Sequence, residues 1–265
     1  MERTIDFSSI DGTHLQGTVT IPRRVRGMMI LAHGITSTRE EWGIFKSLAS
    51  AAERISVASF RFDYRCHGYN KLPFSDFSLN GVFSDIDSAW NAVSGDADLS
   101  AMLQSVPLFV CGSSFGGGIL YRWASLQSRV RHAFLLAPVF DYFADITKTA
   151  GNWAGDLSAT DTIDYAGNQM SRAIITEAKY FVAIPRDGRD LPALIIHGTS
   201  DDDVPIEMSR RVAEATPHFR LMPIANAGHV LAVPGDFEMV DPQSWKYVRS
   251  AQEAILETMR AALSE

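Results

Sequence analysis

The sequence predicts an α/β fold, with a mostly parallel central sheet, helices on both faces and a small inserted segment. Short apolar runs that fit buried strands alternate with stretches whose apolar residues recur every three or four positions, as on one face of a helix. We expect strands at residues 28–32, 57–62, 107–111, 133–138, 193–197 and 219–224. At 265 residues, of which 46% are hydrophobic, the chain is long enough to bury the core of one large domain.

Before the first buried strand, residues 3–21 fit two strands of an edge hairpin joined at the turn dipeptide Asp11-Gly12. Helical spacing predicts helices between the strands and at the C-terminal end of the sequence. They are expected at residues 42–52, 82–93, 96–104, 114–126, 205–215 and 241–263. These helices would connect parallel strands by crossovers and so cover both faces of the sheet.

The start of the first helix carries its own signal. Ser37 to Glu40 and Thr38 to Glu41 each fit a capping box, in which a hydroxyl and an acidic side chain satisfy free N–H groups at a helix start. Trp42 would then be the first residue of the apolar face of this helix.

Composition excludes several classes of function. The net charge is −7 and no basic stripe is visible, so nucleic acid is not an expected partner. The two cysteines, Cys66 and Cys111, make no disulfide framework, and the first residues lack the apolar core of a signal peptide. No apolar run approaches the length that spans a bilayer, so we expect a cytoplasmic protein.

One stretch, residues 108–118, carries the strongest chemical signal. It contains Gly112-x-Ser114-x-Gly116 between a predicted strand and a predicted helix, the strand-turn-helix signature of a nucleophile elbow. Side chains at the two glycine positions would collide with the neighbouring strand or helix, and the serine would stand at the apex of a strained turn. The alternative interpretation is an ordinary glycine-rich turn.

A serine nucleophile needs a base, and the base needs a carboxylate that orients it. Two strand-end loops downstream supply them: Asp201 is the first acid after the strand at 193–197, and His229 is the titratable residue after the strand at 219–224. Asp141, after the strand at 133–138, is the alternative acid. A solvated acidic turn around Asp201 and a surface histidine at 229 are the alternatives without catalysis.

The remaining histidines and cysteines fit structural roles better. His33, His67 and His197 are expected to bond to backbone groups, and Cys111 to fill a small space in the core. No spacing of His, Cys and Asp resembles a metal site, and we expect neither a metal nor a cofactor.

In these residues and their order, the chain resembles the α/β-hydrolase superfamily, in particular the group of serine aminopeptidases (S33), monoacylglycerol lipases and feruloyl (cinnamoyl) esterases. Five motifs occur in the family's order. They are His33-Gly34, Asp63 to Gly68, Gly112 to Gly116, Gly198 to Pro205 and Gly228-His229. The chain departs from the family pattern at Ser113, where the family usually has His, and at Cys66, where it usually has Gly.

The resemblance implies acyl transfer on a Ser114, His229 and Asp201 triad. It assigns the two donors of an oxyanion hole to the backbone N–H groups of Ile35 and Phe115, with His33, Gly34, Gly112 and Gly116 in supporting positions.

The segment from residue 139 to 190 interrupts the alternation and is rich in Asp, Gly and aromatic residues. We expect it to fold into short helices or a hairpin, inserted into a core of residues 1–138 and 191–265. The resemblance places a lid after the strand at 133–138, so this segment would be a cap that forms the acyl or alcohol pocket. A plain packed subdomain is the alternative.

The function expected from the sequence is therefore that of a carboxylic-ester hydrolase acting on small, partly apolar or aromatic acyl esters. Thioester, peptide or carbon–carbon bond hydrolysis on the same triad is the alternative, followed by a binding protein that keeps the fold without catalysis. The expected partner is a small ester, with a homodimer left open because the C-terminal helix or the N-terminal hairpin could support one.

Overall fold

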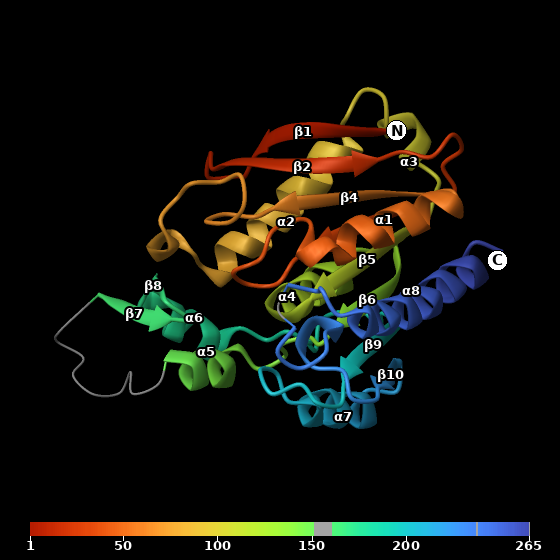
Figure 1. Cartoon of the computed structure of the whole chain (residues 1–265). Helices are drawn as coiled ribbons and strands as arrows, with labels where there is room; N and C mark the ends of the chain where they lie inside the picture. Colours follow the sequence, from red (N-terminus) through yellow and green to blue (C-terminus); the bar gives the residue numbers. More distant parts are fainter. Residues whose placement is uncertain (151–160, 237, 265) are drawn as a thin grey trace.

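A computed structural model describes residues 1–150, 161–236 and 238–264. In this part of the chain, eight strands form one sheet in the order β1-β2-β4-β3-β5-β6-β9-β10 (Figure 1). The strands are β1 (Glu2–Ser8), β2 (His14–Thr20), β3 (Gly27–Ala32), β4 (Val57–Asp63), β5 (Leu108–Ser113), β6 (Val130–Leu136), β9 (Ala193–Gly198) and β10 (Phe219–Ile224). The predicted edge hairpin and all six predicted buried strands are confirmed.

The sheet is mostly parallel, as predicted. Strands β1 and β2 pair antiparallel with each other, and β2 pairs antiparallel with β4. Every other pair of neighbours, from β4 through β10, is parallel. The carboxyl ends of parallel strands meet at one edge of a sheet, so the loops after β3, β5, β9 and β10 come together there.

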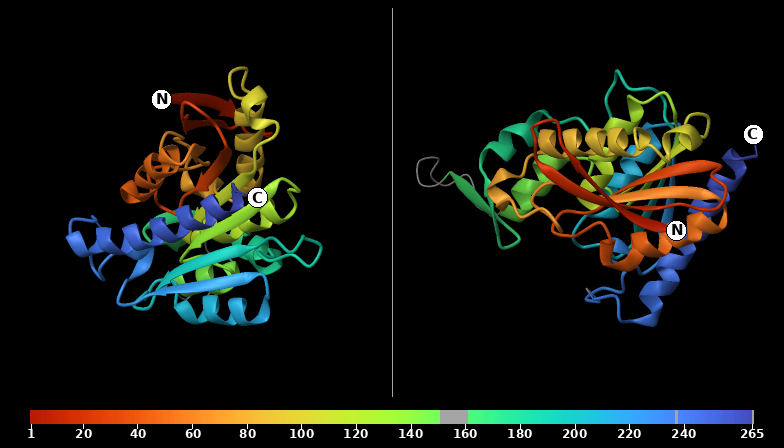
Figure 2. Two further views of the ribbon diagram at one scale, coloured as in Figure 1. Left: turned by 90° about the vertical axis from the view of Figure 1, so that its right-hand side faces the viewer. Right: turned by 90° about the horizontal axis from the view of Figure 1, so that it is seen from above.

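Helices cover both faces of this sheet. They are α1 (Ile44–Arg54), α2 (Leu79–Ser94), α3 (Ser100–Leu103), α4 (Ser114–Ser125), α7 (Ile206–Ala215) and α8 (Pro242–Ala262). Apolar side chains of α1 and α8 pack on one face and those of α2 and α4 on the other, and Figure 2 shows the sheet between them. Because β3 and β5 are buried on both faces, they read as unbroken apolar runs in the sequence.

The inserted segment contains both kinds of structure that the sequence predicted. It has two short helices, α5 (Tyr142–Ala150) and α6 (Ala173–Tyr180), and a hairpin of β7 (Thr162–Tyr165) and β8 (Asn168–Ser171). Residues 151–160 of the predicted insertion lie outside the described residues. Figure 1 shows the segment beyond one end of the sheet.

The predicted capping boxes are wrong. Helix α1 begins at Ile44, after a short 3-10 turn, η1 (Glu41–Gly43), and no side chain caps either element. Glu41 does not reach back to a helix N–H; its carboxylate instead accepts a hydrogen bond from Gly34 N at 3.0 Å. Trp42 has a φ of 56°, outside the helix, and its side chain is exposed rather than packed on an apolar face.

Among the described residues, no helix combines the length and the apolar character needed to cross a membrane.

Candidate active site

The turn between β5 and α4 holds Ser114 in a strained conformation. Its φ of 48° lies in the left-handed region, which a residue with a side chain rarely adopts, and its side chain is buried. A Cβ at Gly112 would lie 2.7 Å from the Cα of Gly117, and one at Gly116 would collide with the carbonyl oxygen of His33. Both glycines are therefore needed for the close approach of strand, helix and loop, as the sequence predicted.

Gly116→Ala is expected to destabilise the fold by about 3 kcal/mol, at the upper end of overpacking costs, because the obstacle is backbone that cannot move aside as a side chain could. Urea denaturation followed by circular dichroism measures this change. Gly228→Ala is the matched control, since a Cβ there meets atoms only at 3.4 Å and beyond. Equal stabilities of the two variants would contradict the expected collision.

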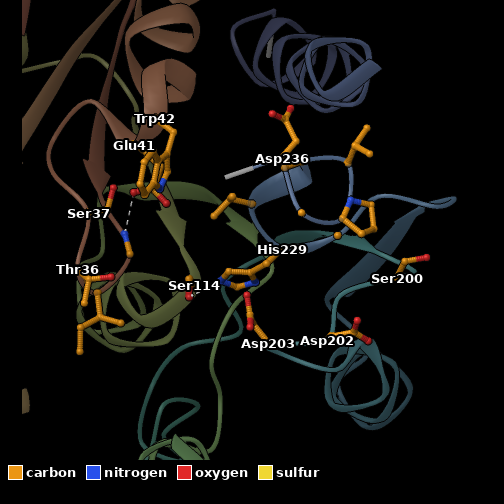
Figure 3. Close-up of a pocket in the computed structure, with 18 residues that line it drawn as sticks. Thr36, Ser37, Glu41, Trp42, Ser114, Ser200, Asp202, Asp203, His229 and Asp236 are labelled. Atoms are coloured by element: carbon orange, nitrogen blue, oxygen red, sulfur yellow. Dashed lines mark hydrogen bonds between the residues drawn. The ribbon is translucent and has the colours of Figure 1, made fainter. Parts of the chain in front are cut away.

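The three side chains singled out in the sequence form a hydrogen-bonded chain. His229 lies in a 3-10 turn, η3 (His229–Leu231), after β10, and its Nε2 is 2.9 Å from Ser114 Oγ. On the other side of the ring, His229 Nδ1 is 2.8 Å from Asp201 Oδ2. Figure 3 shows His229 beside Ser114. With Nδ1–H donating to the carboxylate, Nε2 is left to accept the serine proton.

Asp201 is held so that it stays ionised. Its Oδ1 accepts hydrogen bonds from Val204 N at 2.8 Å and Asp203 N at 3.1 Å, and His197 Nε2 lies 3.2 Å from Oδ2. Burial alone would raise the pKa of Asp201, but the hydrogen bonds from His197 and His229 together lower it well below its usual value. The carboxylate therefore remains an anion facing the imidazole.

The environment of His229 favours its protonated form. Burial would lower its pKa, but the hydrogen bond to Asp201 and the negative charges of Asp201, Asp203 and Glu41 raise it above 6.5. Such an arrangement stabilises an imidazolium when the ring takes up a proton.

Asp201, Asp203 and His229 also form the one group among the described residues whose ligand atoms are close enough for a metal ion, within 4.8 Å of one another. The donors fit a resident metal poorly. Asp201 and His229 already bond to each other, and the second oxygen of Asp201 accepts two backbone N–H groups. Asp203 alone of the three is exposed.

The loop after β3 is fixed by two buried, neutral histidines. His33 Nδ1–H donates to Gly34 O at 2.7 Å, and His67 Nε2 accepts from Thr36 N at 2.9 Å. Burial lowers the pKa of both rings, that of His67 to about 4. In a trans peptide the N–H lies opposite the C=O, so the bond to Gly34 O also orients the N–H of Ile35. No hydrogen bond within the described residues engages that N–H.

Phe115, the second predicted oxyanion donor, is the second residue of α4. Its N–H is therefore one of the groups at a helix start that have no carbonyl partner within the helix. Its carbonyl accepts a 2.5 Å hydrogen bond from the hydroxyl of Tyr142, which in turn accepts from Ile119 N at 2.8 Å. The inserted segment thus contacts the helix directly after Ser114.

A cavity of about 260 Å³ opens beside Ser114 and His229 (Figure 3). It is bordered by three loops: residues 34–42 after β3, 200–203 after β9 and 228–236 after β10. Apolar lining comes from Ile35, Trp42, Val230, Val233 and Pro234. None of the described residues of the segment 139–190 lines it, and residues 151–160 lie outside the described residues, so the role of this segment in the pocket stays a prediction.

Asp141, the alternative acid, lies elsewhere. Its Oδ1 accepts from Ala144 N at the start of α5, and it makes no contact with His229 within the described structure. His197 bonds to Val204 O and Ser209 Oγ, and Cys111 is fully buried, as predicted for core residues.

Cys66 and Ser113, the two departures from the family pattern, have different structural surroundings. Cys66 has a φ of 64°, which is where glycine is favoured and explains the glycine that the family usually has. Ser113 is buried, and its hydroxyl lies beside the carboxylate of Glu41.

Glu41 and Trp42 are among the cavity residues that sequence reasoning missed. Both were assigned to the start of a helix because their spacing fitted one. The signal that could have found them was the position of an acid and a large aromatic residue directly after a buried strand, at the edge where the other loops meet.

Comparison with known proteins supports the fold. A profile of the alpha/beta hydrolase family matches residues 29–238. Est1E from Butyrivibrio proteoclasticus, solved with ferulic acid bound, has a TM-score of 0.75 at 21% identity, over 97% of this chain and 99% of that one. A putative hydrolase from Agrobacterium vitis S4 has a TM-score of 0.74 at 19% identity, over 100% and 99% of the two chains.

A dienelactone hydrolase from Anabaena variabilis ATCC 29413 has a TM-score of 0.62 at 17% identity, with 97% of each chain covered. No curated protein sequence matches the chain. The family profile spans most of the sequence, including the segments that carry Ser114, Asp201 and His229. The chain belongs to the alpha/beta hydrolase family.

Proposed function

We propose that this protein is a serine hydrolase that cleaves small carboxylic esters through an acyl-enzyme. The observation that carries the proposal is the chain of hydrogen bonds from Ser114 Oγ to His229 Nε2 at 2.9 Å and from His229 Nδ1 to Asp201 Oδ2 at 2.8 Å. Family membership supports hydrolysis in general, and this geometry supports a serine nucleophile.

In the proposed reaction, His229 takes the proton of Ser114 as its oxygen attacks the ester carbonyl. The N–H groups of Ile35 and Phe115 stabilise the resulting oxyanion, and Asp201 stabilises the imidazolium. His229 then protonates the leaving alcohol, and the same ring activates the water that releases the acid from Ser114. Net, one water splits one ester into an acid and an alcohol.

The size and lining of the cavity support a small substrate. About 260 Å³ bordered by Trp42 and several aliphatic side chains suits one aromatic ring or a short acyl chain. The fold it shares with Est1E, which was solved with ferulic acid bound, adds an aromatic acid to the acyl groups worth testing.

We further propose that residues 139–190 act as a cap on a core of residues 1–138 and 191–265. Two contacts support this interpretation. Tyr142 bonds to the helix that follows Ser114, and Lys148 Nζ bonds to the carbonyl oxygens of Asp202 and Asp203 beside Asp201. The segment is thus tied to both the proposed nucleophile and the loop of the proposed acid.

Covalent labelling with a fluorophosphonate probe tests the proposed function. Wild-type protein should label at Ser114 and turn over p-nitrophenyl acetate and butyrate, Ser114→Ala should not label, and Ser50→Ala, which changes an exposed serine of α1, should label as wild type. A wild-type protein that neither labels nor hydrolyses a broad ester panel would refute the proposal. Labelling with turnover only of acyl-CoA or aminoacyl substrates would move it to thioester or peptide hydrolysis.

The acid limb of the pH profile should reflect the raised pKa of His229. Protonated His229 cannot accept the serine proton, so kcat/KM is lost as pH falls through this raised pKa. Asp203→Asn removes one of the charges that raise the pKa and should move the limb to lower pH, whereas Asp187→Asn in the inserted segment should leave it in place. An unchanged limb in Asp203→Asn would show that Asp203 does not act on the ring.

A further inference from the structure

Glu41 is a buried acid that the proposed mechanism does not yet use. Its side chain has no solvent exposure, although its backbone lies in a loop at the mouth of the cavity. Glu41, Trp42 and Gly43 have φ values of 44°, 56° and 87°, so three consecutive residues adopt the left-handed conformation. Two of them carry side chains, and this strained turn directs Glu41 inward ahead of α1.

The two carboxylate oxygens of Glu41 have different surroundings. Oε2 accepts a hydrogen bond from Gly34 N at 3.0 Å, which Figure 3 shows as a dashed line. Oε1 is buried and has no hydrogen-bond partner among the described residues, and no Lys or Arg of the described structure forms an ion pair with either oxygen. Burying an acid without a cation costs stability, so packing alone does not explain a glutamate here.

Glu41 also lies close to the proposed nucleophile. A Cβ built at Gly34 would be 3.3 Å from Glu41 Oε1 and 3.3 Å from the Cβ of Ser114, so both side chains lie beside this glycine. Burial raises the pKa of Glu41, and the nearby hydroxyls of Ser113 and Ser37 and the N–H of Gly34 offset this rise only in part. The small residue at 113, where the family usually has histidine, leaves its hydroxyl beside the acid.

The hydrogen bonds of this loop define what Glu41 holds in place. The N–H of Gly34 bonds to Glu41, the C=O of Gly34 accepts from His33, and the N–H of Thr36 donates to His67. Both peptide groups next to the Cα of Gly34 are therefore fixed, although glycine itself would allow them to rotate. Between the two engaged N–H groups, that of Ile35 has no partner among the described residues and is available to a substrate oxygen.

We infer that Glu41 is a positioning residue: it anchors Gly34 so that the N–H of Ile35 stays aimed at the oxyanion that forms during hydrolysis. This inference rests on the proposed function. Glu41 acts through the backbone and does not touch the reacting atoms. Losing the anchor should therefore affect the transition state, in which negative charge develops on the carbonyl oxygen, far more than the binding of the neutral ester.

Two substitutions separate the anchoring oxygen from the charge. Glu41→Gln keeps an acceptor oxygen at the length that reaches Gly34 N and removes the charge. Glu41→Asp keeps the charge but draws the carboxylate back by one methylene, away from Gly34 N. We expect Glu41→Asp to lower kcat for p-nitrophenyl butyrate about 100-fold with KM changed less than about threefold, as for loss of one oxyanion donor. Glu41→Gln should keep kcat within about tenfold of wild type.

The controls distinguish positioning from folding and from failure of the proposed function. Circular dichroism and urea denaturation establish that both variants are folded at the assay temperature, and Glu40→Gln, at the more exposed neighbouring acid, should have wild-type kinetics. Unchanged kcat in Glu41→Asp, or equal losses of kcat in both variants, would overturn the inference. If wild-type Ser114 is still labelled by the fluorophosphonate probe in that case, the proposed function stands. Absence of that labelling would overturn the proposed function and the inference together.

Discussion

Replacing Ser114 with alanine should lower kcat for p-nitrophenyl butyrate by about 10⁴- to 10⁶-fold, because the substrate carbonyl then has no nucleophile to form an acyl-enzyme. The residual rate would come from the oxyanion donors and His229 acting on a bound water. Steady-state hydrolysis measured at 405 nm gives kcat, and a purified, folded variant is required because traces of wild-type enzyme would hide so large a loss.

The structure suggests that Ser114→Ala should fold well. The substitution removes one oxygen and keeps the Cβ, so the strained turn and the glycines around it are unchanged. Its melting temperature should match wild type, with Ser50→Ala as the control for loss of a serine hydroxyl on the surface. A folded Ser114→Ala with more than about one tenth of wild-type activity would show that another residue attacks the ester.

If the proposed function holds, Asp201→Asn should lower kcat by about 10⁴-fold, as the equivalent change does in a serine protease with the same triad. The asparagine can place its NH₂ group toward His229 Nδ1, and the ring must then accept there and carry its proton on Nε2. Nε2–H donates instead of accepting, so the ring cannot take the proton of Ser114. The loss arises from the wrong tautomer rather than from a displaced side chain.

The interaction of Asp201 with His229 also predicts a change in the pH dependence of Asp201→Asn. The negative charge of Asp201 and its hydrogen bond to the ring raise the pKa of His229. Removing the charge should therefore lower this pKa and move the acid limb of the residual activity to lower pH. Asp202→Asn is the matched control, because Asp202 is adjacent but exposed and contributes no hydrogen bond to the ring. If Asp202→Asn lost as much activity as Asp201→Asn, the assignment of the acid would be wrong.

The sequence by itself determined the order and type of the elements that form the sheet. Residues 28–32 of β3 and 108–111 of β5 are unbroken apolar runs, as expected for strands that are buried on both faces of a sheet. The elbow could also be predicted from the sequence, because its glycine-serine-glycine pattern lies within five residues between a strand and a helix; Gly112 is required by contacts with Gly116 and Gly117, whereas Gly116 is required by contacts with the loop after β3. Patterns of this kind can be recognised because they depend on residues that are close together in the sequence.

The sequence placed Ser114, Asp201 and His229 each after a predicted strand, and that was enough to suggest that they meet. It left Asp141 as a second acid, since both acids follow neighbouring strands. Only the tertiary structure separated them: Asp201 Oδ2 is 2.8 Å from the ring, while Asp141 caps the start of α5.

The tertiary structure alone decided the environment of the site. Glu41 fitted a capping box by spacing, yet the backbone turns left-handed there and its carboxylate bonds to Gly34, a residue on the other side of the loop. The cavity likewise is lined by loops 34–42, 200–203 and 228–236, which are far apart in sequence, and none of the described residues of the segment 139–190 lines it. Spacing along the sequence indicates which residues can lie on the same helix or strand. It does not indicate which hydrogen-bond partner a polar side chain will have, because that depends on which groups the fold brings within bonding distance.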